Sequence, residues 1–220
     1  MVQSTPAPRD RVIDAGAEPT FLTVPGLGGS GPLHWQTRWE ESDPRVTRVD
    51  MGDWEAPNRN LWVNRLNLAV HRAAAGGRPV VLVAHSLGCL TVAWWAHYER
   101  PQWADPVIGA LLVAPPEVDN APRDPRLLAF APTPLAPLPF PSVIVASRDD
   151  PWSSLERSGR LAVFWGSRFV DGGTLGHINA DSALGEWRGG QHELARLARM
   201  ALSEGFSPGP AIAEPLTLFA

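Results

Sequence analysis

One serine of the chain lies where an apolar run changes abruptly into a helical pattern. Residues 80–84 are apolar and mostly β-branched, which predicts a buried strand, and residues 87–98 continue with helical character. Ser86 lies between them, with the small residues Ala84 and Gly88 two positions away on either side. This arrangement is typical of a nucleophile elbow, a sharp turn that holds a serine hydroxyl above the edge of a sheet. The usual motif has glycine at the first small position, and alanine there still lets strand and helix approach closely.

The position of Ser86 has two interpretations. Free N–H groups and the helix dipole favour negative charge at a helix N-terminus, which suits an oxyanion forming on a substrate carbonyl. Serine is also among the best N-cap residues, so Ser86 could simply begin the helix after a buried strand. A catalytic role therefore requires a base and an acid elsewhere in the chain.

A base and an acid are both found after later apolar runs. Serine is a weak nucleophile unless a base removes its proton and a third group orients that base. On a sheet with such an elbow, the acid and then the histidine follow the serine along the chain. Asp149 and Asp150 come directly after one apolar run, and His177 follows another through a glycine-rich turn. We expect these side chains to meet Ser86 at the carboxyl edge of the sheet.

Spacing does not choose between Asp149 and Asp150. One carboxylate could orient His177 while the other caps a helix near Pro151, since proline is favoured at a first helical position. His85 would have to fold back over the turn to act as the base, so it is expected to pack or to form hydrogen bonds. The remaining histidines lie in helical patterns and are expected to be solvated or half-buried: His34, His71, His97 and His192.

An oxyanion hole needs two backbone donors, and two are expected close to Ser86. One is the N–H of Leu87, and the other is the N–H of Leu27 in a glycine-rich loop at 25–32. That loop lacks the Gly-x-Gly-x-x-Gly pattern and a Lys-Ser/Thr ending, which argues against phosphate binding. The candidate residues for a substrate pocket are Gly26, Trp54, His85 and Phe130.

The sequence indicates no metal or organic cofactor, because no group of residues has the spacing of metal ligands. Cys89 is the single cysteine and is expected to be buried and inert. One cysteine cannot form an internal disulfide, and residues 1–20 lack the apolar stretch of a signal peptide. We therefore expect a cytoplasmic protein.

The composition is typical of a single globular domain, with 220 residues of which 44% are hydrophobic and 19% charged. A net charge of −4 without a basic patch argues against a nucleic-acid partner. No apolar run reaches the roughly 18 residues of a membrane span. The expected partner is a small-molecule acyl substrate, and the sequence does not indicate an oligomeric state.

Short apolar runs alternate with helical patterns along the chain. The runs that predict strands are residues 21–24, 46–49, 80–84, 107–113, 143–147 and 168–170. The helical patterns are residues 34–41, 61–75, 85–98, 155–164 and 192–203. The alternation predicts an α/β fold with a doubly wound, mostly parallel six-stranded sheet and helices on both faces. We expect the strand order 2-1-3-4-5-6, with the ligand site at the switch between strands 1 and 3.

The expected domain comprises residues 19–204, after a flexible leader at 1–18 and before a tail at 205–220. Within it, segment 117–141 is rich in proline, which disfavours any long helix. A non-periodic insertion of this length is either a solvent-exposed loop or a binding loop. Its position after the strand next to the nucleophile strand favours a small lid.

Several of these motifs resemble the small serine hydrolases typified by retinoblastoma-binding protein nine and its bacterial relatives. The resemblance covers about residues 20–204, and its most diagnostic pieces are Asp-Asp-Pro at 149–151 and Gly-His-Ile-Asn-Ala at 176–180. Other shared stretches are 24–26, 34–35 with Trp39, 53–54 with Pro57, and 83–88. The resemblance implies an α/β-hydrolase fold, metal-free esterase-like activity, and a triad of Ser86, Asp150 and His177. It favours Asp150 because the acid of that family directly precedes the proline.

These observations predict a carboxylesterase-like serine hydrolase, which cleaves esters or related acyl compounds through an acyl-enzyme. Two alternatives stay open from the sequence. The same triad could act on an amide or a thioester, or the chain could be a binding protein that kept the fold and lost turnover. A complete triad in the expected order argues against the second alternative.

Overall fold

The protein is described by a computed structural model, which covers residues 18–203. Its sheet has the strand order β2-β1-β3-β4-β5-β6, and every neighbouring pair of strands is parallel. This confirms the predicted six-stranded topology. The strands are β1 (Thr20–Val24), β2 (Val46–Arg48), β3 (Val80–His85), β4 (Val107–Val113), β5 (Ser142–Ala146) and β6 (Arg168–Asp171). The expected leader and tail, 1–18 and 205–220, lie outside the described residues except for residue 18.

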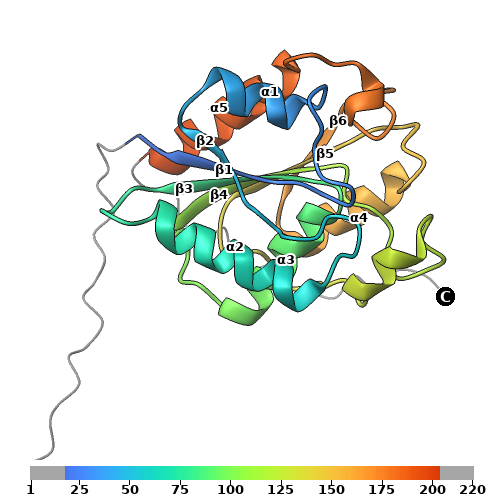
Figure 1. Cartoon of the computed structure of the whole chain (residues 1–220), viewed down its shortest axis with the longest axis horizontal. Helices are drawn as coiled ribbons and strands as arrows, with labels where there is room; N and C mark the ends of the chain where they lie inside the picture. The colour runs from blue at the N-terminus through green and yellow to red at the C-terminus, as the bar shows by residue number, and fades with distance from the viewer. Residues whose placement is uncertain (1–17, 204–220) are drawn as a thin grey trace, which may run out of the picture.

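Helices cover both faces of the sheet (Figure 1). They are α1 (Trp35–Ser42), α2 (Arg59–Ala73), α3 (Leu87–Glu99), α4 (Leu155–Trp165) and α5 (Arg188–Leu202). The α2, α3 and α4 helices pack on one face, and α1 and α5 pack on the other.

Alternate residues of β3 contribute to the two hydrophobic cores. Val80, Leu82 and Ala84 pack in the core beneath α2, α3 and α4. Val81 and Val83 pack in the core beneath α1 and α5. Successive side chains of a strand point to opposite faces, so a strand buried on both sides is apolar throughout. The result is a central strand whose carboxyl end, at Ser86, is rigidly placed.

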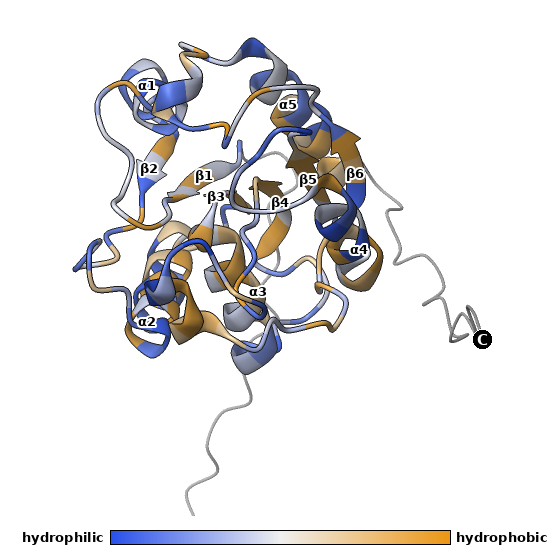
Figure 2. Ribbon diagram, turned by 90° about the vertical axis from the view of Figure 1, so that its right-hand side faces the viewer, coloured by the Kyte–Doolittle hydropathy of each residue, from blue (hydrophilic) through white to orange (hydrophobic). Residues whose placement is uncertain are grey.

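Hydropathy along the ribbon follows the same arrangement (Figure 2). The strands at the centre of the sheet are hydrophobic, whereas α1 and α2 carry hydrophilic stretches. Among residues 18–203, no helix is both long and apolar enough to cross a membrane.

The start of α5 differs most from the sequence-based expectation. The helix begins at Arg188, four positions before the expected residue 192, and includes Gly189 and Gly190 in its first turn. Glycine disfavours helix, which hid this turn in the sequence. A Cβ atom on Gly190 would lie 2.2 Å from the Trp187 ring, so the glycine allows that ring to pack against the helix.

The proline-rich segment 117–141 is not a wholly solvent-exposed loop, because part of it packs into the core. It forms a short 3-10 helix, Pro125–Phe130, and buries Leu127, Phe130 and Phe140 in the core beneath α2 and α3. The Trp94 indole donates a hydrogen bond to the Phe130 carbonyl over 2.8 Å. The segment therefore extends the helical layer on one face of the sheet.

Candidate active site

Ser86 lies at the tight turn between β3 and α3. Its backbone has φ 53° and ψ −125°, a conformation that costs a non-glycine residue free energy and that is typical of functional turns. The turn is held by the Ser86 N–H, which donates to the Val113 carbonyl of β4 over 2.9 Å. Although Ser86 occupies the N-cap position of α3, its side chain forms no cap hydrogen bond. The hydroxyl is therefore available for a partner outside the helix.

Two glycines allow the turn to pack closely. A Cβ atom on Gly88 would lie 2.0 Å from the Val24 carbonyl oxygen at the end of β1. A Cβ atom on Gly26 would lie 2.8 Å from the Ser86 Cβ and 3.0 Å from the Leu87 nitrogen. The predicted pocket residue Gly26 thus lies against the serine itself and brings the β1 loop beside it.

The structure brings Ser86, His177 and Asp150 together. The distance from His177 Nε2 to Ser86 Oγ is 2.9 Å, and His177 Nδ1 lies 2.9 and 3.0 Å from the two Asp150 carboxylate oxygens. Because a carboxylate only accepts, Nδ1 carries the proton and the Ser86 hydroxyl donates to Nε2. The side chains of His177 and Asp150 are 8% and 3% exposed. A buried serine–imidazole–carboxylate chain of this kind can move a proton off the serine.

Asp149 and Asp150 have different partners. Asp149 accepts hydrogen bonds from the Ser147 hydroxyl over 2.6 Å and from the Gly176 N–H over 2.9 Å, and these bonds lower its pKa. Asp149 therefore holds the turn that precedes His177, whereas Asp150 contacts the imidazole. Asp150 also accepts from the Trp152 N–H, but the N-cap of α4 is Ser154.

Of the two expected oxyanion donors, Leu87 directly follows Ser86, and Leu27 lines the same cavity as Ser86. In the described part of the chain, neither the Leu27 N–H nor the Leu87 N–H has a hydrogen-bond acceptor. The loop that carries Leu27 is fixed by hydrogen bonds from the Gly28 N–H to the Trp54 carbonyl and from the Gly29 N–H to the Gly26 carbonyl, each over 3.0 Å. Two amides that await an acceptor beside a serine hydroxyl can bind a developing oxyanion.

A cavity of about 160 Å³ opens over Ser86. It is lined by Leu27, Gly29, Gly31, His34, His85, Ser86, Trp152, His177, Asn179 and Ala180. Of the predicted pocket residues, His85 lines this cavity. Trp54 packs behind the loop, where a Cβ atom on Gly29 would lie 3.3 Å from the Trp54 ring.

The prediction that Phe130 lines the pocket is wrong. Phe130 is fully buried, and its ring packs edge-on against Trp62 with the centroids 5.5 Å apart. The aromatic side chain that reaches the cavity is Trp152, whose ring lies 5.3 Å from the His177 ring. Its position two residues after Asp150 could have indicated this, since a side chain so close to the acid must lie near the site.

His34 was expected to be solvated or half-buried, and it is 3% exposed. Its Nδ1 accepts a hydrogen bond from the Gln36 N–H at the start of α1. Burial, with the nearby charge of Arg48, lowers its pKa to about 4. The pKa of His85 is also well below its usual range, chiefly because the ring is buried. Both imidazoles are therefore neutral near neutral pH.

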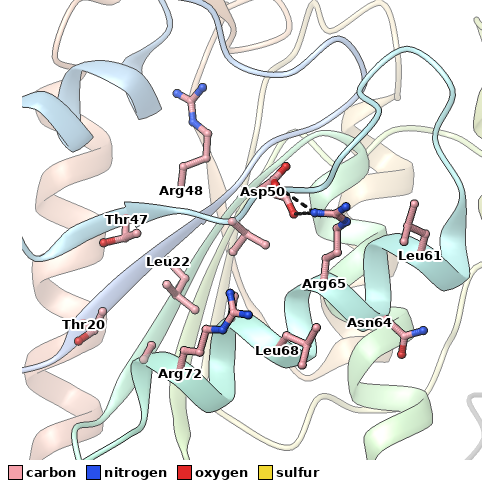
Figure 3. Close-up of a pocket in the computed structure, with 13 residues that line it drawn as sticks. Thr20, Leu22, Thr47, Arg48, Asp50, Leu61, Asn64, Arg65, Leu68 and Arg72 are labelled. Carbon is pink, nitrogen blue, oxygen red and sulfur yellow. Dashed lines mark hydrogen bonds and ion pairs between the residues drawn. The ribbon is translucent and has the colours of Figure 1, made fainter.

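A larger groove of about 720 Å³ lies between β2 and α2 (Figure 3). It contains none of the triad residues. Two of its arginines are already paired: Arg65 contacts Asp50, and Arg48 turns away from the groove toward Glu40. The groove is therefore separate from the Ser86 site.

No cluster in residues 18–203 has three histidine, cysteine or acidic side chains placed to hold a metal ion. Cys89 is fully buried, and burial raises the pKa of its thiol well above the usual value. Its Sγ lies 3.4 Å from the Val113 carbonyl oxygen, to which the thiol donates. Cys89 therefore stays a thiol and is inert in the folded protein.

Comparison with known proteins gives one family match. The model of the family described as Serine hydrolase matches residues 21–196. Among curated proteins, no match to the chain was found.

Several solved structures are similar. A YdeN-like hydrolase from Pectobacterium atrosepticum is 30% identical, with a TM-score of 0.73, and the match covers 88% of this chain and 97% of that one. The ydeN gene product from B. subtilis is 17% identical with a TM-score of 0.62, covering 82% of this chain and 98% of that one. A thermophilic esterase from Thermogutta terrifontis is 17% identical with a TM-score of 0.62, covering 86% and 92%.

Proposed function

The chain belongs to the serine hydrolase family, and we propose that it hydrolyses carboxylic esters through an acyl-enzyme on Ser86. The observation that carries this proposal is the buried contact of Ser86 Oγ with His177 Nε2, continued from His177 Nδ1 to Asp150. In this arrangement the serine proton has an acceptor 2.9 Å away before any substrate binds. The resemblance to the retinoblastoma-binding protein nine type supports the same three residues.

Acylation begins when Ser86 Oγ attacks the ester carbonyl carbon and its proton passes to His177 Nε2. The carbonyl oxygen becomes an oxyanion, which accepts hydrogen bonds from the Leu27 and Leu87 N–H groups. The tetrahedral intermediate then collapses, the bond to the alcohol oxygen breaks, and His177 returns the proton to the leaving alcohol. The acyl group stays on Ser86.

Deacylation repeats these steps with water. His177 takes a proton from the attacking water, and a second tetrahedral intermediate forms at the same two N–H groups. Its collapse releases the carboxylic acid and returns the proton to Ser86. Throughout, the Asp150 carboxylate keeps the proton of His177 on Nδ1 and stabilises the imidazolium that forms.

The size of the cavity supports a short acyl group. A volume of about 160 Å³ is well below the roughly 300–1,000 Å³ of sites for drug-sized ligands. The lining combines the apolar surfaces of Leu27 and Trp152 with the amide of Asn179. We expect p-nitrophenyl acetate to be cleaved with a higher kcat/KM than p-nitrophenyl octanoate.

The test is Ser86→Ala, assayed on p-nitrophenyl acetate and with a fluorophosphonate probe. We expect the fold to be retained, labelling to be lost and kcat to fall by at least about 10³-fold. Ser158→Ala is the control, because that serine is buried on α4 outside the cavity. Unchanged turnover in Ser86→Ala would overturn the assignment.

Matched substrates separate the alternatives. The acetyl ester, anilide and thioester of similar leaving groups are compared at one pH. We expect the ester to have the highest kcat/KM, while a preference for the anilide or thioester would change the substrate class and keep the triad. Wild-type protein that neither turns over nor labels would favour a binding role.

A further inference from the structure

The His177 loop has a strained backbone next to the imidazole. Gly176 and Ile178 have φ of 57° and 49°, so the residues on both sides of His177 lie in the left-handed region. This region is unfavourable for a β-branched residue, and such strain persists only where surrounding contacts impose it. The residues that hold this loop therefore also determine where the imidazole stands.

Two buried side chains donate hydrogen bonds to this strained backbone. His85 Nε2 lies 2.9 Å from the His177 carbonyl oxygen, and Trp35 Nε1 lies 2.8 Å from the Ile178 carbonyl oxygen. Because a carbonyl oxygen only accepts, His85 carries its proton on Nε2. His85 and Trp35 are 4% and 1% exposed, so each bond is shielded from water.

The two donors come from β3, which ends directly before the serine, and from α1. His85 is the last residue of β3 and directly precedes Ser86, while Trp35 opens α1 after the glycine-rich loop. The rings also contact one another, since the centroids of Trp35 and His85 lie 6.2 Å apart and those of His85 and His177 lie 5.0 Å apart. The serine and the backbone of its base are thus joined through a single side chain.

The α1 helix holds the following residues in the same way. Trp39 Nε1 donates to the Glu186 carbonyl over 2.6 Å, and the ring of Trp187 lies 5.0 Å from that of Trp35. The stretch from His177 to Trp187 is therefore attached to α1 by indole donors at both of its ends. Of these hydrogen bonds, those from His85 and Trp35 reach the backbone at His177 and Ile178, next to the imidazole.

We propose that His85 and Trp35 are positioning residues for the proposed hydrolysis, holding His177 within reach of Ser86 through its backbone. The changes in kcat that we expect from this positioning rest on the proposed function, the hydrolysis of esters at Ser86. Misplacing a catalytic group by about 1 Å can cost on the order of 10²-fold in rate. Losing one of two donors allows part of that movement. Trp35 is not part of the cavity lining, so its loss leaves substrate binding largely unchanged, whereas His85 also lines the cavity.

Two kinds of variant separate the hydrogen bond from the ring. One removes the N–H donor and keeps an aromatic ring, and the other keeps a donor and removes the ring. Trp35→Phe and His85→Phe keep an aromatic ring without the N–H, and His85→Gln keeps an amide donor in place of Nε2. Trp165→Phe is the matched control: the Trp165 indole also donates to a carbonyl, that of Pro134 over 2.7 Å, on the opposite face of the sheet.

We expect Trp35→Phe and His85→Phe each to lower kcat about tenfold or more on p-nitrophenyl acetate. KM should stay within about threefold in Trp35→Phe, because Trp35 is not part of the cavity lining. His85→Gln should recover most of the His85→Phe loss. Trp165→Phe should lower the melting temperature about as much as Trp35→Phe does. It should leave kcat within about twofold of the wild type. If Trp35→Phe and His85→Phe keep wild-type kcat, or if Trp165→Phe loses as much, the positioning role is wrong.

A spectroscopic readout separates this inference from the proposed function. The proton that His177 Nδ1 shares with Asp150 should give a downfield proton NMR signal in the wild type. We expect the signal to broaden or disappear in Trp35→Phe and to persist in Trp165→Phe. A wild type without turnover that shows this pattern would reject the hydrolase and retain the positioning role; a signal unchanged in Trp35→Phe would reject the positioning role alone.

Discussion

Three imidazoles lie side by side next to Ser86, and their partners give them different chemistry. The ring centroids of His34 and His85 are 4.7 Å apart, and those of His85 and His177 are 5.0 Å apart. Only His177 has a carboxylate partner, whereas burial holds the pKa of the other two below the usual range. Since the two buried rings stay neutral, the imidazolium proposed to form on His177 during acyl transfer has no cationic imidazole beside it.

The low pKa of His34 predicts an acid-dependent loss of stability. The unfolded histidine has a pKa of 6.5 and the folded one about 4, so the unfolded chain binds more protons between these values. His34 therefore contributes its full stability above pH 6.5 and loses it as the pH falls to 4, a loss of about 3 kcal/mol. The free energy of unfolding, measured by urea titration from pH 7.5 to 4, should fall accordingly.

His34→Asn tests this assignment, because asparagine can keep the N-cap bond to Gln36 and does not titrate. The variant should show a shallower dependence of unfolding free energy on pH than the wild type. Burial is the chief cause of the lowered His85 pKa and is the same in both proteins, so most of the difference between the two curves comes from His34. Parallel curves would show that His34 is not the titrating group.

At the scale of elements, the elbow depends on how closely α3 approaches β1. A Cβ atom on Gly88 would lie 2.0 Å from the Val24 carbonyl oxygen and 2.9 Å from the Pro25 carbonyl oxygen, and this backbone leaves it no room. Gly88→Ala should therefore lower the free energy of unfolding by at least about 3 kcal/mol, or prevent folding. Chemical denaturation followed by circular dichroism measures this.

Gly159 provides the matched substitution. It lies inside α4, and a Cβ atom there would have nothing within 4 Å. Because alanine favours helix over glycine, Gly159→Ala should raise the free energy of unfolding by about 0.5–1 kcal/mol. A destabilised Gly159→Ala, or a tolerated Gly88→Ala, would contradict the packing described for these helices.

The sequence predicted the elements around the site well because their signals are local. The fully apolar run of β3 and the small residues around Ser86 depend only on neighbours in the chain, and the β4 bounds 107–113 agree with the structure to the residue. Parallel order then brings the ends of β3, β5 and β6 to one edge, which explains why Ser86, Asp150 and His177 could be proposed as partners.

The features that the sequence did not predict depend on contacts between distant residues. His34 is buried because α1 lies over the carboxyl end of β3, and nothing next to it in the chain indicates this. Phe130 was predicted to line the pocket, because nothing in the proline-rich sequence around it indicates its packing against Trp62. The carbonyl bonds from Trp35 and His85 join residues more than 90 positions apart, at His177 and Ile178.

At the scale of the whole molecule, one buried arginine joins segment 117–141 to α4. Arg157 Nε donates to Glu117 over 2.6 Å, and Nη2 contacts Asp119 over 3.2 Å and the Thr133 hydroxyl over 3.1 Å. Arg157 is 8% exposed, while the Glu117 and Asp119 side chains are 23% and 31% exposed. This network makes the segment part of the folded core.

Arg157→Met should release the segment, because it leaves two neighbouring carboxylates without their cation. We expect the free energy of unfolding to fall by about 2 kcal/mol, less than for a fully buried pair since the carboxylates are partly exposed. Amide hydrogen exchange in 117–141 should accelerate. Arg160→Met is the control, since its pair with Glu156 on the same helix is exposed and should change stability by less than about 0.5 kcal/mol.

The same variant decides whether the segment acts as a lid. None of its residues lines the cavity over Ser86, so loosening it should leave kcat/KM for p-nitrophenyl acetate within about threefold. Two contacts link it to Trp152 at the site. The Glu117 N–H donates to the Trp152 carbonyl over 2.8 Å, and the Arg123 guanidinium lies 5.6 Å from the centroid of the Trp152 ring. A large change in kcat/KM with faster exchange confined to 117–141 would mean that the segment controls access to Ser86. Unchanged kinetics with the same faster exchange would limit its role to stabilising the α2–α3 face of the sheet.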